Sequence, residues 1–136
     1  MVVLAVVAVG WLAMQELDMS ETAESETAVS RLVGELKAIG GLKGRDIANI
    51  LNVSPPTVTR WSKGEGSPTI DKQTVMAELR WVAARLADFY NPDEVRLWLQ
   101  SPHPQLNGAR PYDLINEGRT RDVLEVIERL DSGVYL

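Results

Sequence analysis

The sequence predicts an all-α fold, and three observations support this prediction. Apolar residues recur at helical spacing over residues 27–39, 71–90 and 120–130. Residues 41–64 have the pattern of two short helices joined by a tight turn. Asn91-Pro92 and Pro111 are typical helix starts. We therefore expect an N-terminal helix-turn-helix bundle, one long connecting helix and a small C-terminal helical unit.

The composition argues against catalysis and metal binding. The chain has no cysteine and one histidine, His103, so disulfides and thiolate metal sites are excluded. A zinc site or a histidine-based triad would need other residue types almost entirely. No glycine-rich phosphate loop appears. We predict no catalytic residue, no metal and no cofactor, in a protein that is not an enzyme and is cytoplasmic.

The charge of the chain is unevenly distributed. The net charge is −5, yet residues 31–64 carry six basic and two acidic residues. An acidic protein with one basic segment can still bind a polyanion at that segment.

Residues 1–26 are expected to be an extension outside the folded unit. The apolar run from Val2 to Met14 is too short to span a membrane, and no basic residue precedes it. Met14 and Met19 are later possible start sites, so residues 1–18 are interpreted as a disordered extension or an artefact of start assignment. The acidic stretch from Glu21 to Glu26 is interpreted as a linker.

Residues 27–70 are predicted to form the first domain. The helix over residues 27–39 should bury one face and end at Gly40-Gly41. In the helix-turn-helix, Asn52-Val53-Ser54 makes the turn, and Ser54 caps a second helix that opens with two prolines and ends at Gly64. The inward residues are Val29, Leu32, Val33, Leu36 and Ile39 in the first helix, and Ile47, Ala48, Leu51, Val58 and Trp61 in the pair.

This pair resembles the DNA-binding unit of Cro/repressor-type regulators. The resemblance implies that the outward residues of the second helix lie in a major groove, with Lys43 and Arg45 near phosphates. These outward residues are Thr57, Thr59, Arg60 and Lys63. The alternative is a helical scaffold with a solvated basic face.

Residues 71–90 are predicted to form the connecting helix. Its apolar stripe has the narrow spacing of a coiled coil. Two roles remain open: the stripe joins the two ends of one monomer, or it is a seam for self-association. The stripe consists of Val75, Leu79, Val82, Leu86 and Phe89, and a second apolar side consists of Met76, Trp81, Ala83 and Tyr90.

Residues 91–136 should form the C-terminal unit. Asn91 and Glu94 can build a capping box for a helix that ends by Ser101-Pro102. A stiff loop follows over residues 101–111, with three prolines and Gly108. Pro111 opens a helix that Gly118 closes. Thr120 is expected to cap a final helix that ends at Gly133, with Val123, Leu124, Ile127 and Leu130 on its inner face.

Two details of this unit have a plain interpretation from the residues alone. The apolar tail Val134-Tyr135-Leu136 is favoured to fold back onto the core of its own chain rather than to be presented to a partner. The nearby acidic and basic residues form a solvated ion-pair face and not a catalytic acid pair. They are Asp113, Glu117, Asp122, Arg110, Arg119 and Arg121.

The C-terminal unit also resembles the toxin-binding domain of the Xre/MbcA/ParS antitoxins, which neutralise RES-domain toxins that consume or transfer parts of NAD. The matching residues are Asn91-Pro92, Trp98-Leu99, Ser101-Pro102, Pro104, Leu106, Gly108, Pro111, Leu114, Gly118, Val123 and Gly133-Val134-Tyr135. His103 departs from the pattern, where asparagine is expected more often.

This resemblance implies an antitoxin that occludes the active site of a RES-domain toxin and represses its own operon through operator DNA. It also implies a homodimer that assembles with the toxin into a higher hetero-oligomer, and it favours a presented tail. The implied toxin-binding residues are Trp98, Ser101, Pro102, His103, Pro104, Leu106, Arg110, Gly133, Val134, Tyr135 and Leu136. The alternative is a transcription regulator whose C-terminal part only oligomerises.

Overall fold

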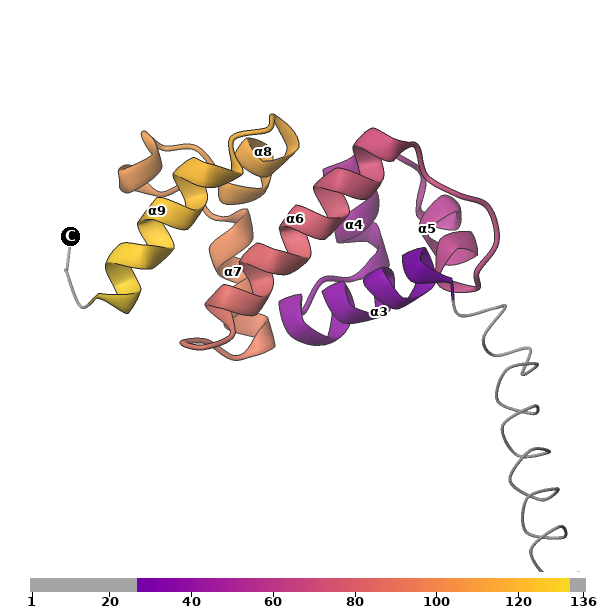
Figure 1. Cartoon of the computed structure of the whole chain (residues 1–136), viewed down its shortest axis with the longest axis horizontal. Coiled ribbons are helices and arrows are strands. Elements are labelled where there is room, and N and C mark those ends of the chain that lie inside the picture. Colours follow the sequence, from indigo (N-terminus) through magenta and orange to yellow (C-terminus); the bar gives the residue numbers. More distant parts are fainter. Residues whose placement is uncertain (1–26, 133–136) are drawn as a thin grey trace, which may run out of the picture.

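A computed structural model describes residues 27–132, and this part of the chain is built from helices alone (Figure 1). The all-α prediction is confirmed. The expected extension 1–26 and the tail 133–136 lie outside the described residues. The helices are α3 (Ala28–Gly40), α4 (Gly44–Leu51), α5 (Pro55–Ser62), α6 (Ile70–Leu86), α7 (Pro92–Gln100), the 3-10 helix η1 (Pro104–Leu106), α8 (Pro111–Asn116) and α9 (Thr120–Asp131).

The first three helices begin and end close to the predicted residues. The Thr27 hydroxyl accepts a hydrogen bond from the Ser30 amide at 3.0 Å and caps α3, and Gly41 ends it with a φ of 62°. Asn52 turns the chain between α4 and α5 with a φ of 56°, and the Ser54 hydroxyl caps α5. The inward residues predicted for this pair, from Ile47 to Trp61, are all buried.

Helix α6 is the central element of the fold. In Figure 1 it crosses the middle of the molecule in front of α4 and α7, with α3 on one side and α9 on the other. It ends at Leu86, four residues before the predicted end at Tyr90. Leu79, Val82 and Leu86 are fully buried, whereas Phe89 beyond the helix end is 41% exposed.

The predicted coiled-coil stripe is therefore core. Met76 and Ala83, expected on a second side, are also fully buried, so one broad face of α6 packs against the other helices of the same chain. This burial fits the role of joining the two ends of one monomer, and self-association along α6 stays a prediction.

The C-terminal helices follow the prediction with one correction. The Asn91 and Glu94 capping box is present at the start of α7. Thr120, however, is the first residue of α9 and not its cap, which is Arg119. The Thr120 side chain is instead buried and its hydroxyl donates to Glu78 Oε2 on α6 at 2.8 Å. Val126, which was not predicted, joins Val123 and Ile127 in the core.

The N-terminal and C-terminal helices share one hydrophobic core. An ion pair between Glu35 and Arg80 joins α3 to α6 on the surface. The turn after α3 packs closely against the start of α7, where a Cβ on Gly41 would lie 2.3 Å from the Pro92 carbonyl oxygen. None of the helices in residues 27–132 is long and apolar enough to cross a membrane.

Candidate functional site

The loop between α7 and α8 is a closed turn. The His103 amide donates to the Ala109 carbonyl at 3.1 Å, and the Gly108 amide donates to the His103 carbonyl at 2.9 Å. Asn107 and Gly108 take φ values of 56° and 82°, which asparagine and glycine accept most readily. These backbone bonds and the prolines give the loop the defined shape expected from the sequence.

His103 fastens this loop to the end of α7. Its Nε2 lies 2.8 Å from the Trp98 carbonyl oxygen, which also accepts a hydrogen bond from the Ser101 amide at 3.4 Å. The two rings are also in contact, with centroids 4.5 Å apart and planes tilted by 36°. The residue that departs from the family pattern thus has a structural role, which the sequence did not reveal.

The predicted toxin-binding residues in the described range differ in exposure. Leu106 is 7% exposed and holds the loop to the core, so its side chain is not available as a contact. The others form one surface around the loop: Pro102, Pro104 and Arg110 are exposed, and Trp98, Ser101 and His103 are half-buried. Gly133, Val134, Tyr135 and Leu136 lie outside the described residues.

Arg110 is held in place by its neighbours. Its Nε donates to Asp113 Oδ2 at 2.9 Å, and its guanidinium lies 4.7 Å from the centre of the Tyr112 ring. The hydrogen bond to the Asp113 carboxylate raises the pKa of Arg110. The Asp122 carboxylate likewise pairs with Arg119 at 2.8 Å, so two of the three candidate carboxylates are in surface ion pairs.

Sequence reasoning missed one apolar side chain on this surface. Leu97 on α7 is 60% exposed, and its carbonyl accepts a hydrogen bond from the Ser101 hydroxyl at 2.5 Å. The signal was present, because Leu97 is two residues from Val95 and from Leu99, which point inward. A leucine at that spacing on a short helix must face outward.

The second predicted surface is on α4 and α5. Lys43, Arg45, Thr59, Arg60 and Lys63 are exposed, and Thr57 is half-buried. The two threonine hydroxyls are engaged within the helix: Thr57 with Ser54 at 2.7 Å and Thr59 with the Pro55 carbonyl at 3.2 Å. The freely presented polar groups of this surface are therefore mainly cationic.

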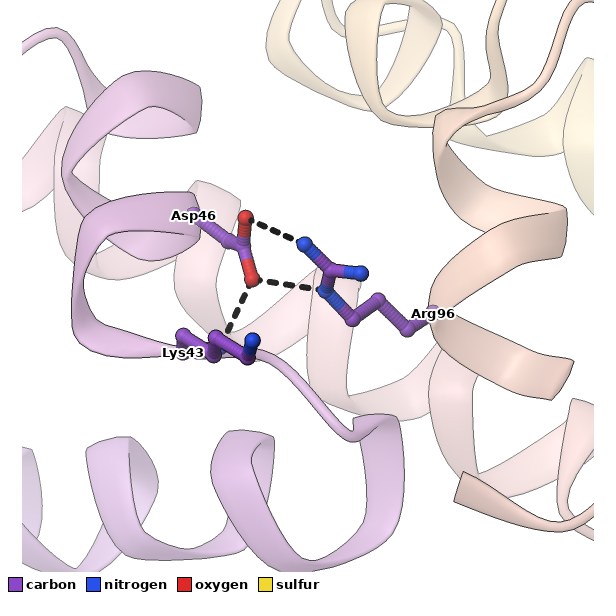
Figure 2. A network of polar contacts seen from close by, with 3 residues as sticks. All are labelled: Lys43, Asp46 and Arg96. Carbon is purple, nitrogen blue, oxygen red and sulfur yellow. Dashed lines mark hydrogen bonds and ion pairs between the residues drawn. The ribbon is translucent and has the colours of Figure 1, made fainter. Parts of the chain in front are cut away.

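A partly buried ion pair joins the two halves of the chain, and no sequence pattern pointed to it. Figure 2 shows Arg96 of α7 donating from Nε to Asp46 Oδ2 of α4 at 2.9 Å and from a second nitrogen to Oδ1 at 3.2 Å. The Lys43 amide donates to the same carboxylate at 2.8 Å. Burial opposes ionisation of Asp46, but the hydrogen bonds from Arg96 and Lys43 outweigh it and lower its pKa.

Comparison with known proteins decides the family. Residues 85–133 match the family described as the antitoxin Xre/MbcA/ParS C-terminal toxin-binding domain. The mycobacterial cidal antitoxin MbcA of Mycobacterium tuberculosis is 31% identical over 96 residues, which cover 71% of this chain and 85% of the relative. The chain belongs to the Xre/MbcA/ParS antitoxin family.

Two further matches cover more of this family member. The probable mycobacterial cidal antitoxin Rv3188 of M. tuberculosis is 30% identical over 118 residues, which cover 87% of this chain and all of the relative. One chain of the crystal structure of the M. tuberculosis MbcT-MbcA toxin-antitoxin complex superimposes with a TM-score of 0.70 and 29% identity. That match covers 81% of this antitoxin and 99% of the solved chain.

The family match locates the loop surface within the antitoxin. Residues 85–133 contain the last two residues of α6, together with α7, η1, α8 and α9. The surface around Trp98 and His103 therefore falls inside the region that carries the toxin-binding description. The match begins six residues before the domain boundary predicted at Asn91, and that boundary stays a prediction.

In the part of the chain that the structure describes, no group of acidic or histidine side chains could hold a metal ion.

Proposed function

We propose that this antitoxin binds a cognate RES-domain toxin, blocks its consumption of NAD, and represses its own operon. The observation that carries the proposal is the match of most of the chain to one chain of a solved toxin-antitoxin complex. The proposed complex forms in the cytoplasm, and the antitoxin contributes binding surfaces but no catalytic group or cofactor.

The surface around the loop is the proposed toxin contact. It combines an exposed leucine, a half-buried tryptophan, two exposed prolines and one fixed arginine, which are Leu97, Trp98, Pro102, Pro104 and Arg110. Tryptophan and arginine are the residue types that most often dominate the energy of an interface. Because backbone hydrogen bonds already order the loop, binding loses little conformational entropy.

Inhibition is proposed to come from the tail Gly133–Leu136. A toxin that uses NAD needs a deep cleft with polar groups for phosphates and riboses. A short segment that enters this cleft competes for the same volume. Tyr135 offers a flat ring with a hydroxyl, which suits such a cleft. The ordered loop would hold the toxin, and the tail after α9 would occupy its active site.

Repression of the operon is proposed for the α4–α5 pair. Its exposed cations, among them Arg60 and Lys63, can neutralise phosphates, and contacts of this kind dominate the affinity of proteins for DNA. The local excess of basic residues over residues 31–64 is consistent with this role in an otherwise acidic chain.

The proposal is tested with the purified cognate toxin, by following the loss of NAD. The full chain should stop this loss, and a chain ending at Ser132 should bind the toxin yet leave NAD consumption largely restored. A Lys37→Ala variant on α3, an exposed residue that belongs to neither proposed surface, is the control and should inhibit fully. Full inhibition by the truncated chain would rule out the tail as the blocking segment. Failure of the full chain to bind the toxin would refute the proposed partner.

A further inference from the structure

The outer face of α5 carries apolar groups toward its start and cations toward its end. The helix packs against α3 and α4 and buries Val58 and Trp61, so its opposite face points to solvent. With about 100° of rotation per residue, that face is formed by residues at the spacing i, i+3, i+4 and i+7. The residues at this spacing are Pro56, Thr59, Arg60 and Lys63, and all of them are exposed.

The first turn of α5 has no free backbone donor for a ligand. Pro55 and Pro56 occupy its first two positions and have no amide N–H. The next amide, that of Thr57, donates to the Ser54 hydroxyl at 3.4 Å. The start of a helix usually presents several unpaired amides to a phosphate or a base edge. The start of α5 presents two pyrrolidine rings instead.

The side chains of α5 also offer few groups that recognise bases by hydrogen bonding. The helix has no asparagine or glutamine, the side chains that pair with adenine. Its hydroxyl groups bind within the helix: Thr59 donates to the Pro55 carbonyl at 3.2 Å, and Ser62 donates to the Thr59 carbonyl at 2.6 Å. Arg60 and Lys63 are assigned to phosphates in the proposed repression. Recognition of bases by this helix therefore falls to apolar contacts.

We propose that the ring of Pro56 and the methyl group of Thr59 contact thymine methyl groups in the major groove of the operator. This inference rests on the proposed repression of the operon by the α4–α5 pair. The C5 methyl of thymine is the apolar group that base pairs present in this groove. Residues three apart on a helix have Cβ atoms about 5–6 Å from each other, and successive base pairs are about 3.4 Å apart. The two side chains can therefore cover the methyl groups of one or two neighbouring thymines.

The cations around the apolar pair favour DNA as the ligand of this face. Residues 31–64 carry six basic and two acidic residues, and Arg60 and Lys63 follow the apolar pair along the helix. Lys63 is seven residues after Pro56, which is about 10 Å along the helix axis. We therefore expect the contacted thymines about three base pairs from the phosphate that Lys63 neutralises. Figure 1 shows α5 and α9 at opposite ends of the molecule, so DNA and toxin would not compete for space.

The test removes the methyl groups without changing the base pairing. The probe is a duplex of the promoter of its own operon, made either with thymine or with uracil, which lacks only the methyl group. Fluorescence anisotropy at one fixed salt concentration measures the affinity of the full chain, alone and with its cognate toxin. We expect the thymine duplex to bind more tightly, by about fourfold for each methyl group that is covered. Replacing the thymines one at a time should locate this preference at one or two neighbouring positions within each site that one α5 covers.

Variants of α5 separate a direct contact from an effect of uracil on the shape of the DNA. Pro56→Ser should bind the two duplexes almost equally, because a hydroxyl group meets the same O4 atom in thymine and in uracil. Pro56→Val keeps an apolar side chain and should keep most of the preference, and Thr59→Ser, which loses one methyl group, should lose part of it. Pro55→Ser is the matched control, since Pro55 lies about 100° away around the helix and should leave the preference unchanged. Circular dichroism checks that each variant is folded.

The outcomes distinguish this inference from the proposed repression. If the full chain binds the promoter no better than a scrambled duplex of equal length, with or without toxin, the proposed repression fails and the thymine contact fails with it. If it prefers the promoter but binds the thymine and uracil duplexes equally, repression stands and the thymine contact is overturned. This measurement needs no variant. A thymine preference that Pro56→Ser retains in full would overturn the role of Pro56.

Discussion

Arg96 and Asp46, fifty residues apart in the sequence, are joined by two hydrogen bonds in the interior between α7 and α4. The pair connects the helices that carry the two proposed binding surfaces. Replacing Arg96 leaves the buried Asp46 carboxylate without its cation, which costs more than the net contribution of the pair. The contribution of this ion pair to the stability of the fold can be measured directly.

Arg96→Met should destabilise the fold by about 2 kcal/mol, below the range for fully buried pairs because the Arg96 side chain is 25% exposed. Asp46→Asn combined with Arg96→Met should recover part of this loss, since neither charge is then left alone. Urea unfolding of the two variants and the full chain measures the difference. Equal stability of the single and double variants would contradict this account.

The same pair predicts a dependence on pH. The pKa of Asp46 is lowered in the folded state, so its stabilising contribution is present above the unfolded pKa of about 3.9 and is lost as pH falls through the lower folded value. The free energy of unfolding should therefore fall below about pH 4. This fall should be smaller in Asp46→Asn than in the full chain. Unfolding in urea at a series of pH values checks the prediction.

Two glycines offer a matched pair of substitutions. Gly41→Ala should destabilise the fold by more than about 1 kcal/mol, because the residue has a φ of 62° and an added Cβ meets the Pro92 carbonyl oxygen. Gly34→Ala, in the middle of α3 with no atom within 4 Å of the added Cβ, should stabilise it by up to about 1 kcal/mol. Thermal melting of both variants measures the two opposite shifts.

His103 should order the loop on the proposed toxin-binding surface. His103→Ala removes both the hydrogen bond to the Trp98 carbonyl and the ring contact, and should cost about 1 kcal/mol of stability and weaken toxin binding. His103→Asn, the residue expected at this position, keeps a side-chain hydrogen-bond donor that is shorter than the imidazole, and should bind the toxin more tightly than the alanine variant. Calorimetric titration measures the affinity for the toxin of the unmodified chain and of the two variants.

The cationic surface of α5 should bind operator DNA through phosphates. Arg60→Ala with Lys63→Ala should reduce operator affinity and lower the slope of log affinity against log salt by about 1 for each lost contact. Toxin binding should not change. Arg121→Ala with Arg129→Ala on α9 is the control of equal charge change, because both residues are exposed and lie on a different helix. An unchanged operator affinity in the double variant would make α4 and α5 a scaffold only.

Periodicity and capping residues predicted the helices because these signals are local. Thr27, Ser54 and Asn91 cap α3, α5 and α7 as expected. Thr120 is a threonine, like Thr27, but its prediction as a helix cap was wrong. Its hydroxyl instead donates a hydrogen bond to Glu78 on another helix. A capping residue and a buried partner of a distant carboxylate cannot be told apart without tertiary contacts.

Long-range features of the candidate surfaces could not be predicted from the sequence, because they too depend on tertiary contacts. The stripe of α6 has the spacing of a coiled coil, but spacing does not show which helices pack against it. In the structure, other helices of the same chain bury its central residues. The pairing of Asp46 with Arg96 follows from the packing of α4 near α7. The prolines and Gly108 predicted a stiff loop, but only the structure shows that Leu106 faces the core and that Leu97 faces the solvent.

The single core built on α6 has a consequence for the turnover of this protein in the cell. Helices that share one core unfold together, and proteases act on unfolded chains. Degradation would not remove the proposed DNA-binding helices and leave the proposed toxin-binding unit intact, or the reverse. If the proposed repression holds, one proteolytic event would relieve it and free the toxin together, and replacement antitoxin could be synthesised from the derepressed operon.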